Sequence, residues 1–150
     1  MPTQSHVPVV VAHRYESPPE RVFDAWLDAE AARRFLFATP HGEMVRAEID
    51  PRVGGHFRLT ERREEGEADH TGEYLEIARP SRLVFTFSAG EPEPDRVTVE
   101  IVPAGEGSDL TLTHDMQAKW ADHMERTRDG WSAVLQGLAD VLGELPARPW

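Results

Sequence analysis

The sequence predicts an α+β fold, in which a curved antiparallel sheet of seven strands wraps around one long C-terminal helix and two short helices lie between the first two strands. Two observations carry this prediction. Residues 43–115 hold one strand-like segment after another, and residues 119–145 follow as a single amphipathic helix. A sheet this long has an apolar face to cover, and the terminal helix is the only predicted element long enough to lie along it. The space between a curved sheet and its helix can become a cavity, so the fold class favours a ligand-binding cup.

The N-terminal part begins with strand periodicity and then changes to helical spacing. Residues 8–16 alternate with the period of a strand that buries one face. Ser17 and the two prolines that follow it are typical of a helix start, so we expect a helix over residues 18–27. Asp28 can cap a second short helix, Ala29–Phe35. These two helices are expected to close one end of the sheet.

Short strands separated by helix and strand breakers occupy the middle of the chain. The predicted strands are 44–50, 55–63, 71–78, 83–88, 97–102 and 109–114. The acidic segment 64–67 is predicted to form a hairpin tip, and the proline and paired glycines of residues 50–55 predict a sharp reversal. Short connections of this kind are typical of an antiparallel meander. Within residues 55–63, the alternation places Arg58 on the outer face and its two apolar neighbours on the inner face.

The C-terminal segment carries the clearest helical pattern. Its apolar stripe recurs at steps of three and four residues and comprises Trp120, Met124, Thr127, Trp131, Val134, Leu138, Val141 and Leu145. Gly130 interrupts this pattern at a cost of about 1 kcal/mol relative to alanine. Such a glycine indicates either the close approach of another element or a kink.

Composition limits the classes of function. A chain of 150 residues predicts a single domain over residues 1–150. The net charge is −11, with no compensating basic stripe, so nucleic acid and anionic membrane surfaces are not expected as partners. The N-terminus resembles no signal peptide and no segment has the length and hydropathy for membrane insertion, so we expect a cytoplasmic protein.

Most catalytic and metal chemistry finds no support in the residue pattern. There is no cysteine, which excludes thiolate ligands and cysteine nucleophiles. The seven histidines are scattered without metal-ligand spacing, and no serine lies in a nucleophile elbow. We therefore expect no metal, no cofactor and no catalytic residue. His114 is in phase with the apolar residues of its strand, which fits a hydrogen-bonded buried histidine and also a cavity-facing one.

Several stretches resemble one family along nearly the whole chain. They are residues 17–26 (SPPERVFDAW), 50–57 (DPRVGGHF), 71–77 (TGEYLEI) with 80–87 (PSRLVFTF), 110–114 (LTLTH), and Gly130-Trp131 with Leu135 and Leu138. The chain thereby resembles the helix-grip superfamily, which includes START lipid-transfer domains and the birch-pollen allergen. Within it, the chain is most similar to small bacterial relatives of the activator of Hsp90 ATPase. This resemblance implies a sheet wrapped around the C-terminal helix and a pocket for an apolar ligand.

The expected ligand is a small apolar or lipid-like molecule held between aromatic side chains of the sheet and the helix. Aromatic side chains and methionine bury large apolar areas, and a few polar groups orient a ligand. The expected contacts are Trp26, Phe57, Tyr74, Phe85, Phe87, His114, Trp120, Met124 and Trp131. Tyr74 or His114 would orient a polar end of the ligand.

Two other functions remain open at this stage. One is an enzyme of the cyclase, dehydratase or hydrolase type, acting on an aromatic or polyketide-like substrate with His114 or Tyr74 as acid or base. The other is an interaction module that regulates a chaperone or a stress response, for which a large exposed apolar patch would be the sign. Homodimerisation through a sheet edge or the first helices is equally open.

Overall fold

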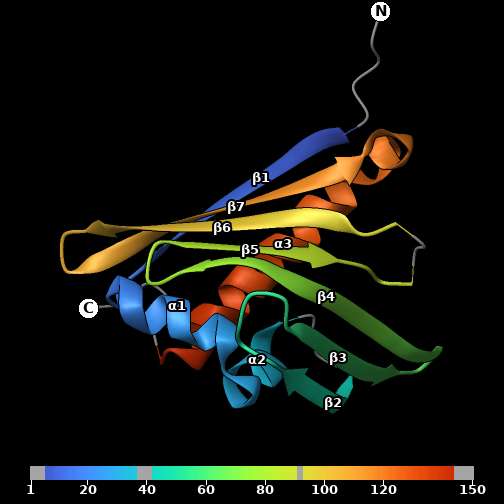
Figure 1. Ribbon diagram of the computed structural model, residues 1–150, viewed down its shortest axis with the longest axis horizontal. Coiled ribbons are helices and arrows are strands. Elements are labelled where there is room, and N and C mark those ends of the chain that lie inside the picture. Colours follow the sequence, from blue (N-terminus) through green and yellow to red (C-terminus); the bar gives the residue numbers. More distant parts are fainter. Residues whose placement is uncertain (1–5, 37–41, 91–92, 144–150) are drawn as a thin grey trace, which may run out of the picture.

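The computed structural model describes residues 6–36, 42–90 and 93–143. Their elements follow one another in the predicted order (Figure 1). These elements are β1 (His6–Tyr15), α1 (Pro19–Leu27), α2 (Ala29–Phe35), β2 (Glu43–Ile49), β3 (His56–Arg63), β4 (Gly66–Ala78), β5 (Arg82–Phe87), β6 (Asp95–Ala104), β7 (Gly107–Gln117), the 3₁₀-helix η1 (Ala118–His123) and α3 (Met124–Val141). The α+β fold class predicted from the sequence is confirmed.

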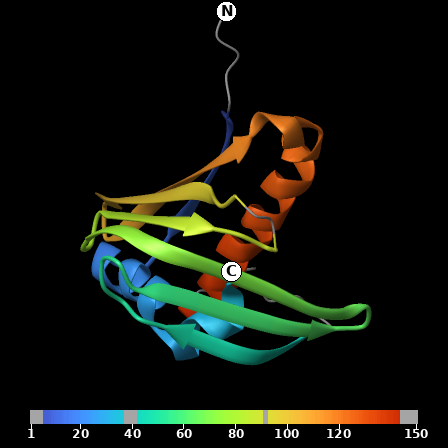
Figure 2. The same cartoon turned by 45° about the vertical axis from the view of Figure 1, so that its right-hand side comes forward.

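The described strands form one antiparallel sheet of seven, in the order β1-β7-β6-β5-β4-β3-β2. Each strand from β2 to β6 pairs with the next along the chain, and β1 pairs with β7 at the far edge. Helices α1 and α2 therefore carry the chain from one edge of the sheet to the other. Figure 2 shows the strands bending past α3, which runs along their inner side.

Alternation along β3 assigns its side chains to two faces as the sequence predicts. Phe57 and Leu59 are buried in the core. Arg58 points outward and pairs with Asp69 of β4 at 2.9 Å. The period-two pattern therefore fixes which residues can reach the space between the sheet and α3.

The two predicted turns are present and one of them is tied to the sheet. Arg63 lies opposite Gly66, so the acidic segment forms a hairpin tip, and β4 begins earlier than residue 71. Gly54 has φ = 87°, a conformation that favours glycine. Its amide donates to the carbonyl oxygen of Tyr74 at 2.9 Å, and the amide of Tyr74 donates to Gly55 at 2.9 Å. The paired glycines thus hold the β2–β3 connection against β4.

The terminal helix is shorter than predicted at both ends. Residues 118–123 form 3₁₀ turns, because β7 runs directly into them and the chain must turn tightly before the α-helix begins at Met124. The helix ends at Val141, where Gly143 has φ = 79° and its amide donates to Asp140. A left-handed glycine of this kind commonly stops a helix. Leu145, the last member of the predicted stripe, lies outside the described residues.

The C-terminal half of α3 is fixed to β1 and α2. Its buried side chains are Trp131, Val134, Leu135, Leu138 and Ala139. The hydroxyl of Tyr15 in β1 donates to the carbonyl oxygen of Leu135 at 2.7 Å. Phe35 of α2 lies directly over Gly137, so a Cβ there would come within 3.3 Å of its Cβ. Of the two explanations offered for Gly130, a close approach or a kink, the close approach is wrong, because a Cβ at that position meets nothing within 4 Å. Gly137 is the helix glycine that another element approaches closely.

Replacing Gly130 with alanine should raise the free energy of unfolding by about 1 kcal/mol, since the new methyl group enters open space and the helix gains propensity. The matched change Gly137→Ala should give a smaller gain or a loss, because its methyl group presses on Phe35. Urea denaturation of both variants measures the difference. Equal gains in the two variants would contradict the packing described for α2 and α3.

Candidate functional site

Four of the predicted ligand contacts form one close-packed aromatic cluster in the core. Trp26, Phe57, Tyr74 and Phe85 are each at most 3% exposed. Phe85 lies with its ring centroid 5.5 Å from that of Phe57 and 6.4 Å from that of Tyr74. Burial raises the pKa of the Tyr74 hydroxyl well above its usual range, so this group stays protonated. These rings support the inner face of the sheet.

Three further predicted contacts form a second cluster nearer the start of α3. The ring centroids of Phe87, His114 and Trp131 lie 5.7–5.9 Å from one another. On the other side of Phe87, the ring of His70 stacks in parallel at 6.0 Å. Phe87 is only half-buried, whereas His114 and Trp131 are buried. The fold therefore brings two aromatic rings and two imidazole rings together where β4, β5 and β7 meet α3.

A buried chain of hydrogen bonds joins this cluster across the sheet. The indole N–H of Trp131 donates to Nδ1 of His114 at 2.8 Å. Because Nδ1 accepts, Nε2 carries the hydrogen and donates to Oδ2 of Asp95, also at 2.8 Å. Trp131 thereby fixes the tautomer of His114. The predicted hydrogen-bonded histidine is present, and it also borders a pocket.

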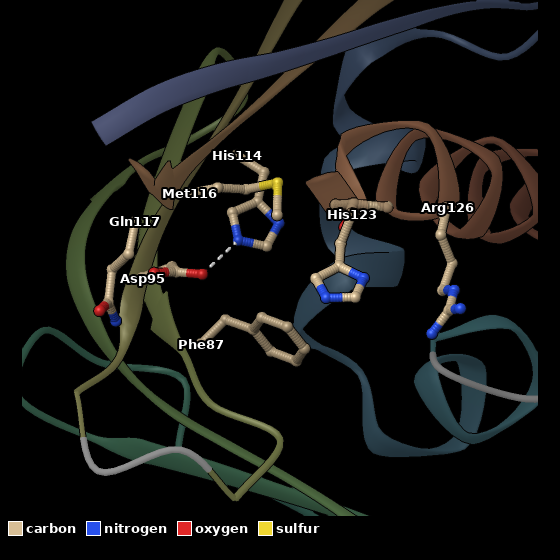
Figure 3. A pocket seen from close by; sticks show the side chains of 8 residues that line it. Phe87, Asp95, His114, Met116, Gln117, His123 and Arg126 are labelled. Atoms are coloured by element: carbon tan, nitrogen blue, oxygen red, sulfur yellow. Dashed lines mark hydrogen bonds and ion pairs between the residues drawn. The ribbon is translucent and has the colours of Figure 1, made fainter. Parts of the chain in front are cut away.

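A pocket of about 300 Å³ opens between the ends of β5, β6 and β7 and the first turn of α3 (Figure 3). It is lined by Phe87, Asp95, His114, Met116, Gln117, His123, Arg126 and Thr127. Phe87 and Met116 give it an apolar floor on the sheet side. In Figure 3, His123 and Arg126 extend from the helix side, with His123 nearer to Phe87 and His114 in this view. An apolar floor with a few convergent polar groups is typical of a small-molecule site.

The remaining predicted contacts lie outside this lining. Met124 is half-buried at the first position of α3 and does not line the pocket. The side chain of Trp120 is not among those that the structure describes. Of the nine predicted contacts, Phe87 and His114 line the pocket directly and Trp131 supports it through His114.

Six lining residues were not predicted, and some carried a recognisable signal. Met116 is two residues beyond His114 in the same strand phase. Thr127 belongs to the predicted helical stripe. Asp95 was missed because the segment before residue 97 contains several breakers, whereas β6 already begins at Asp95, opposite Phe87. Gln117, His123 and Arg126 lie where β7 turns into the helix, a turn that a continuous helix prediction does not describe.

The geometry limits the acid–base chemistry that this site can perform. Both ring nitrogens of His114 are engaged, one as acceptor and one as donor, so neither offers a lone pair to a substrate. Tyr74 lies in the core and does not line the pocket. No group of three or more histidine, aspartate or glutamate side chains within residues 6–36, 42–90 and 93–143 could hold a metal ion. Neither His114 nor Tyr74, the two predicted acid or base candidates, is therefore placed for proton transfer in this pocket.

A curved antiparallel sheet that clasps one long helix, with a pocket at one end of their interface, defines a helix-grip domain. Residues 16–143 match the family described as activator of Hsp90 ATPase homolog 1-like protein, and the chain belongs to this family. No curated protein matches the chain. None of the described helices is long and apolar enough to cross a membrane.

Solved structures of bacterial proteins share the fold. Protein CV1439 of Chromobacterium violaceum is 26% identical, with a TM-score of 0.79 over 89% of this chain and 95% of that one. An AHSA1-like protein of Aeromonas hydrophila, solved by NMR, is 22% identical, with a TM-score of 0.79 over 91% and 92% of the two chains. CalU16 of Micromonospora echinospora is 22% identical, with a TM-score of 0.70 over 91% and 76%.

Replacing Trp131 with phenylalanine should destabilise the protein more than the same change at Trp26. Trp131→Phe leaves the buried Nδ1 of His114 without its donor, a loss of about 1–3 kcal/mol beyond the lost volume. Trp26 is equally buried, but its Nε1 has no hydrogen-bond partner among the described residues, so Trp26→Phe costs volume alone. Chemical denaturation of both variants tests this. Equal losses would show that the hydrogen bond to His114 contributes nothing.

The stability should fall as the pH drops below 6.5, in part because of His70. Burial lowers the pKa of this imidazole below its ordinary value of 6.5, so the unfolded chain takes up a proton that the folded protein refuses. The stability contributed by neutral His70 is fully present above pH 6.5. It is lost as the pH falls from 6.5 toward the pKa of His70 in the folded protein. His70→Phe keeps a ring beside Phe87 and removes the titration.

Denaturation at a series of pH values between about 7.5 and 5 compares the two proteins. The variant should show a flatter decline than the wild type over this range. The lowered carboxyl pKa values of Asp24 and Asp69, held down by Arg79 and Arg58, act only below pH 3.8 and do not interfere. Parallel curves would contradict a lowered pKa for His70.

Proposed function

We propose that the protein binds a small, mainly apolar molecule in the pocket between the sheet and the start of α3. The observation that carries this proposal is the combination of an apolar floor, Phe87 and Met116, with polar groups around the rim of a cavity of about 300 Å³. That volume lies at the small end of the range for ligand pockets. Domains of this fold commonly bind hydrophobic ligands.

The deeper aromatic residues have a supporting role in this proposal. Trp26, Phe57, Tyr74 and Phe85 pack against one another and keep the inner face rigid. A rigid floor lowers the conformational cost of binding, because few side chains must become ordered. We place the ligand against Phe87 and His114, with the first turn of α3 above it. Trp120 and Met124 stay predicted contacts near that turn.

The two rival functions receive less support from the site and the surface. An acid or base would need a ring nitrogen that His114 does not offer. A chaperone-regulating surface would need a contiguous apolar patch. The large apolar side chains exposed on the described residues stand apart on β1, β2, the β2–β3 turn and β6, and are Val10, Val45, Val53 and Val102. The hydrogen bonds of His114 do not favour catalysis over ligand binding, and the scattered exposed valines do not favour a chaperone-binding surface.

Thr127→Trp should abolish binding of an apolar fluorescent compound, N-phenyl-1-naphthylamine. Thr127 lines the pocket and is half-buried, so the indole would fill the space above Phe87. Arg128→Trp is the matched control, since the next residue of the helix is exposed and lies outside the pocket lining. We expect an affinity loss of at least about tenfold, or about 1.4 kcal/mol, in Thr127→Trp alone.

Fluorescence titration of the wild type and both variants measures this, with circular dichroism as a check of folding. Native mass spectrometry of freshly purified protein, followed by denaturing extraction, looks for a co-purifying molecule. Unchanged binding by a folded Thr127→Trp variant would place the binding elsewhere. Absence of binding by the wild type would overturn the proposed function.

A further inference from the structure

We propose that the ligand of this pocket is an amphipathic acid, whose carboxylate or equivalent anion binds the guanidinium of Arg126. This inference rests on the proposed function and names the chemical class of the ligand. It follows from how charge is arranged around the pocket on the described residues.

Arg126 is exposed at the pocket rim and pairs with no carboxylate among the described residues. Several other arginines of the protein, Arg58 and Arg79 among them, are held by acidic partners. Arg58 lies 2.9 Å from Asp69, and Arg79 lies 2.7 Å from Asp24. In a chain with 27 acidic and 16 basic residues, an arginine at a pocket without such a partner is available to an anionic ligand.

The acidic residue of the same pocket does not pair with this arginine. Asp95 directs Oδ2 to His114 at 2.8 Å, and its Oδ1 is buried without a hydrogen-bond partner among the described residues. The carboxylate is therefore held on the sheet side by His114 and forms no ion pair with Arg126 among the described residues. Gln117 directs its amide nitrogen to the carbonyl oxygen of Glu93. The accessible charge on the rim is thus that of the guanidinium, with His123 beside it on the helix side (Figure 3).

The two sides of the pocket complement the two ends of an amphipathic acid. Phe87 and Met116 offer apolar contact on the sheet side, and Arg126 offers a planar set of N–H donors on the helix side. A guanidinium binds a carboxylate through paired hydrogen bonds, which a lysine ammonium cannot reproduce. Because Arg126 is exposed, the attraction should be modest and should weaken with salt.

The test compares two fluorescent compounds that differ only by an acid. 8-Anilinonaphthalene-1-sulfonate carries a sulfonate, which stands in for the carboxylate, on the same rings as the neutral N-phenyl-1-naphthylamine. Both are titrated against the wild type, Arg126→Gln, Arg126→Lys and the control Arg128→Gln. The wild type should bind the sulfonate more tightly, and Arg126→Gln should weaken sulfonate binding about fivefold while weakening binding of the neutral compound much less. Arg126→Lys should restore part of the affinity, and high salt should reduce the preference.

Each contrary outcome has a distinct meaning. Equal affinity of the wild type for the two compounds would overturn the inference. The proposed function would still stand if Thr127→Trp abolished binding of the neutral compound. Equal weakening by Arg126→Gln and Arg128→Gln would show a general effect of charge and overturn the role of Arg126. Failure of both compounds to bind would overturn the proposed function, and the inference with it.

Discussion

The packing of the C-terminal half of α3 against the inner face of the sheet is the contact on which the other features depend. Every fully buried side chain of the helix lies at Trp131 or beyond, whereas residues 124–130 are exposed or half-buried. The hydroxyl of Tyr15 and the Cβ and backbone of Phe35 contact this half from β1 and α2. The strands extend past the buried part of the helix, so the inner face is left incompletely covered at one end. The pocket lies at that end.

A chain of hydrogen bonds separates the packed core from the pocket. Trp131 and His114 are buried, and each polar atom of their contact has a partner. A buried polar group that loses its partner is costly, so the chain from Asp95 to Trp131 holds these rings in one arrangement. Below it, Phe57, Phe85 and their neighbours fill the space completely enough to form ring-to-ring contacts. Above it, Phe87 and Met116 are the large apolar side chains among the described residues that line the pocket.

The periodicity of apolar residues in the sequence was sufficient to predict the fold and the face of the sheet on which each strand residue lies. Phe57 and Leu59 turn inward and Arg58 outward because adjacent residues of a strand must point to opposite sides. Periodicity does not predict, however, whether an inward-facing side chain lies in the packed core or borders a pocket. Phe85 and Phe87 share one phase of β5, yet one is closed in by neighbouring rings and the other borders the pocket. That difference depends on where α3 ends its contact with the sheet, which the shortened helix and the 3₁₀ turns determine.

The strong negative charge of the chain and the cationic rim of its pocket are compatible because they act over different distances. A net charge of −11 repels extended polyanions, which must approach many carboxylates at once. At physiological ionic strength, charges beyond about 8 Å are largely screened, so a small molecule in the pocket experiences mainly the groups that line it. Among these, Asp95 is engaged with His114 and Arg126 faces the rim. A strongly negative net charge is therefore compatible with the proposed binding of a small acid in this pocket.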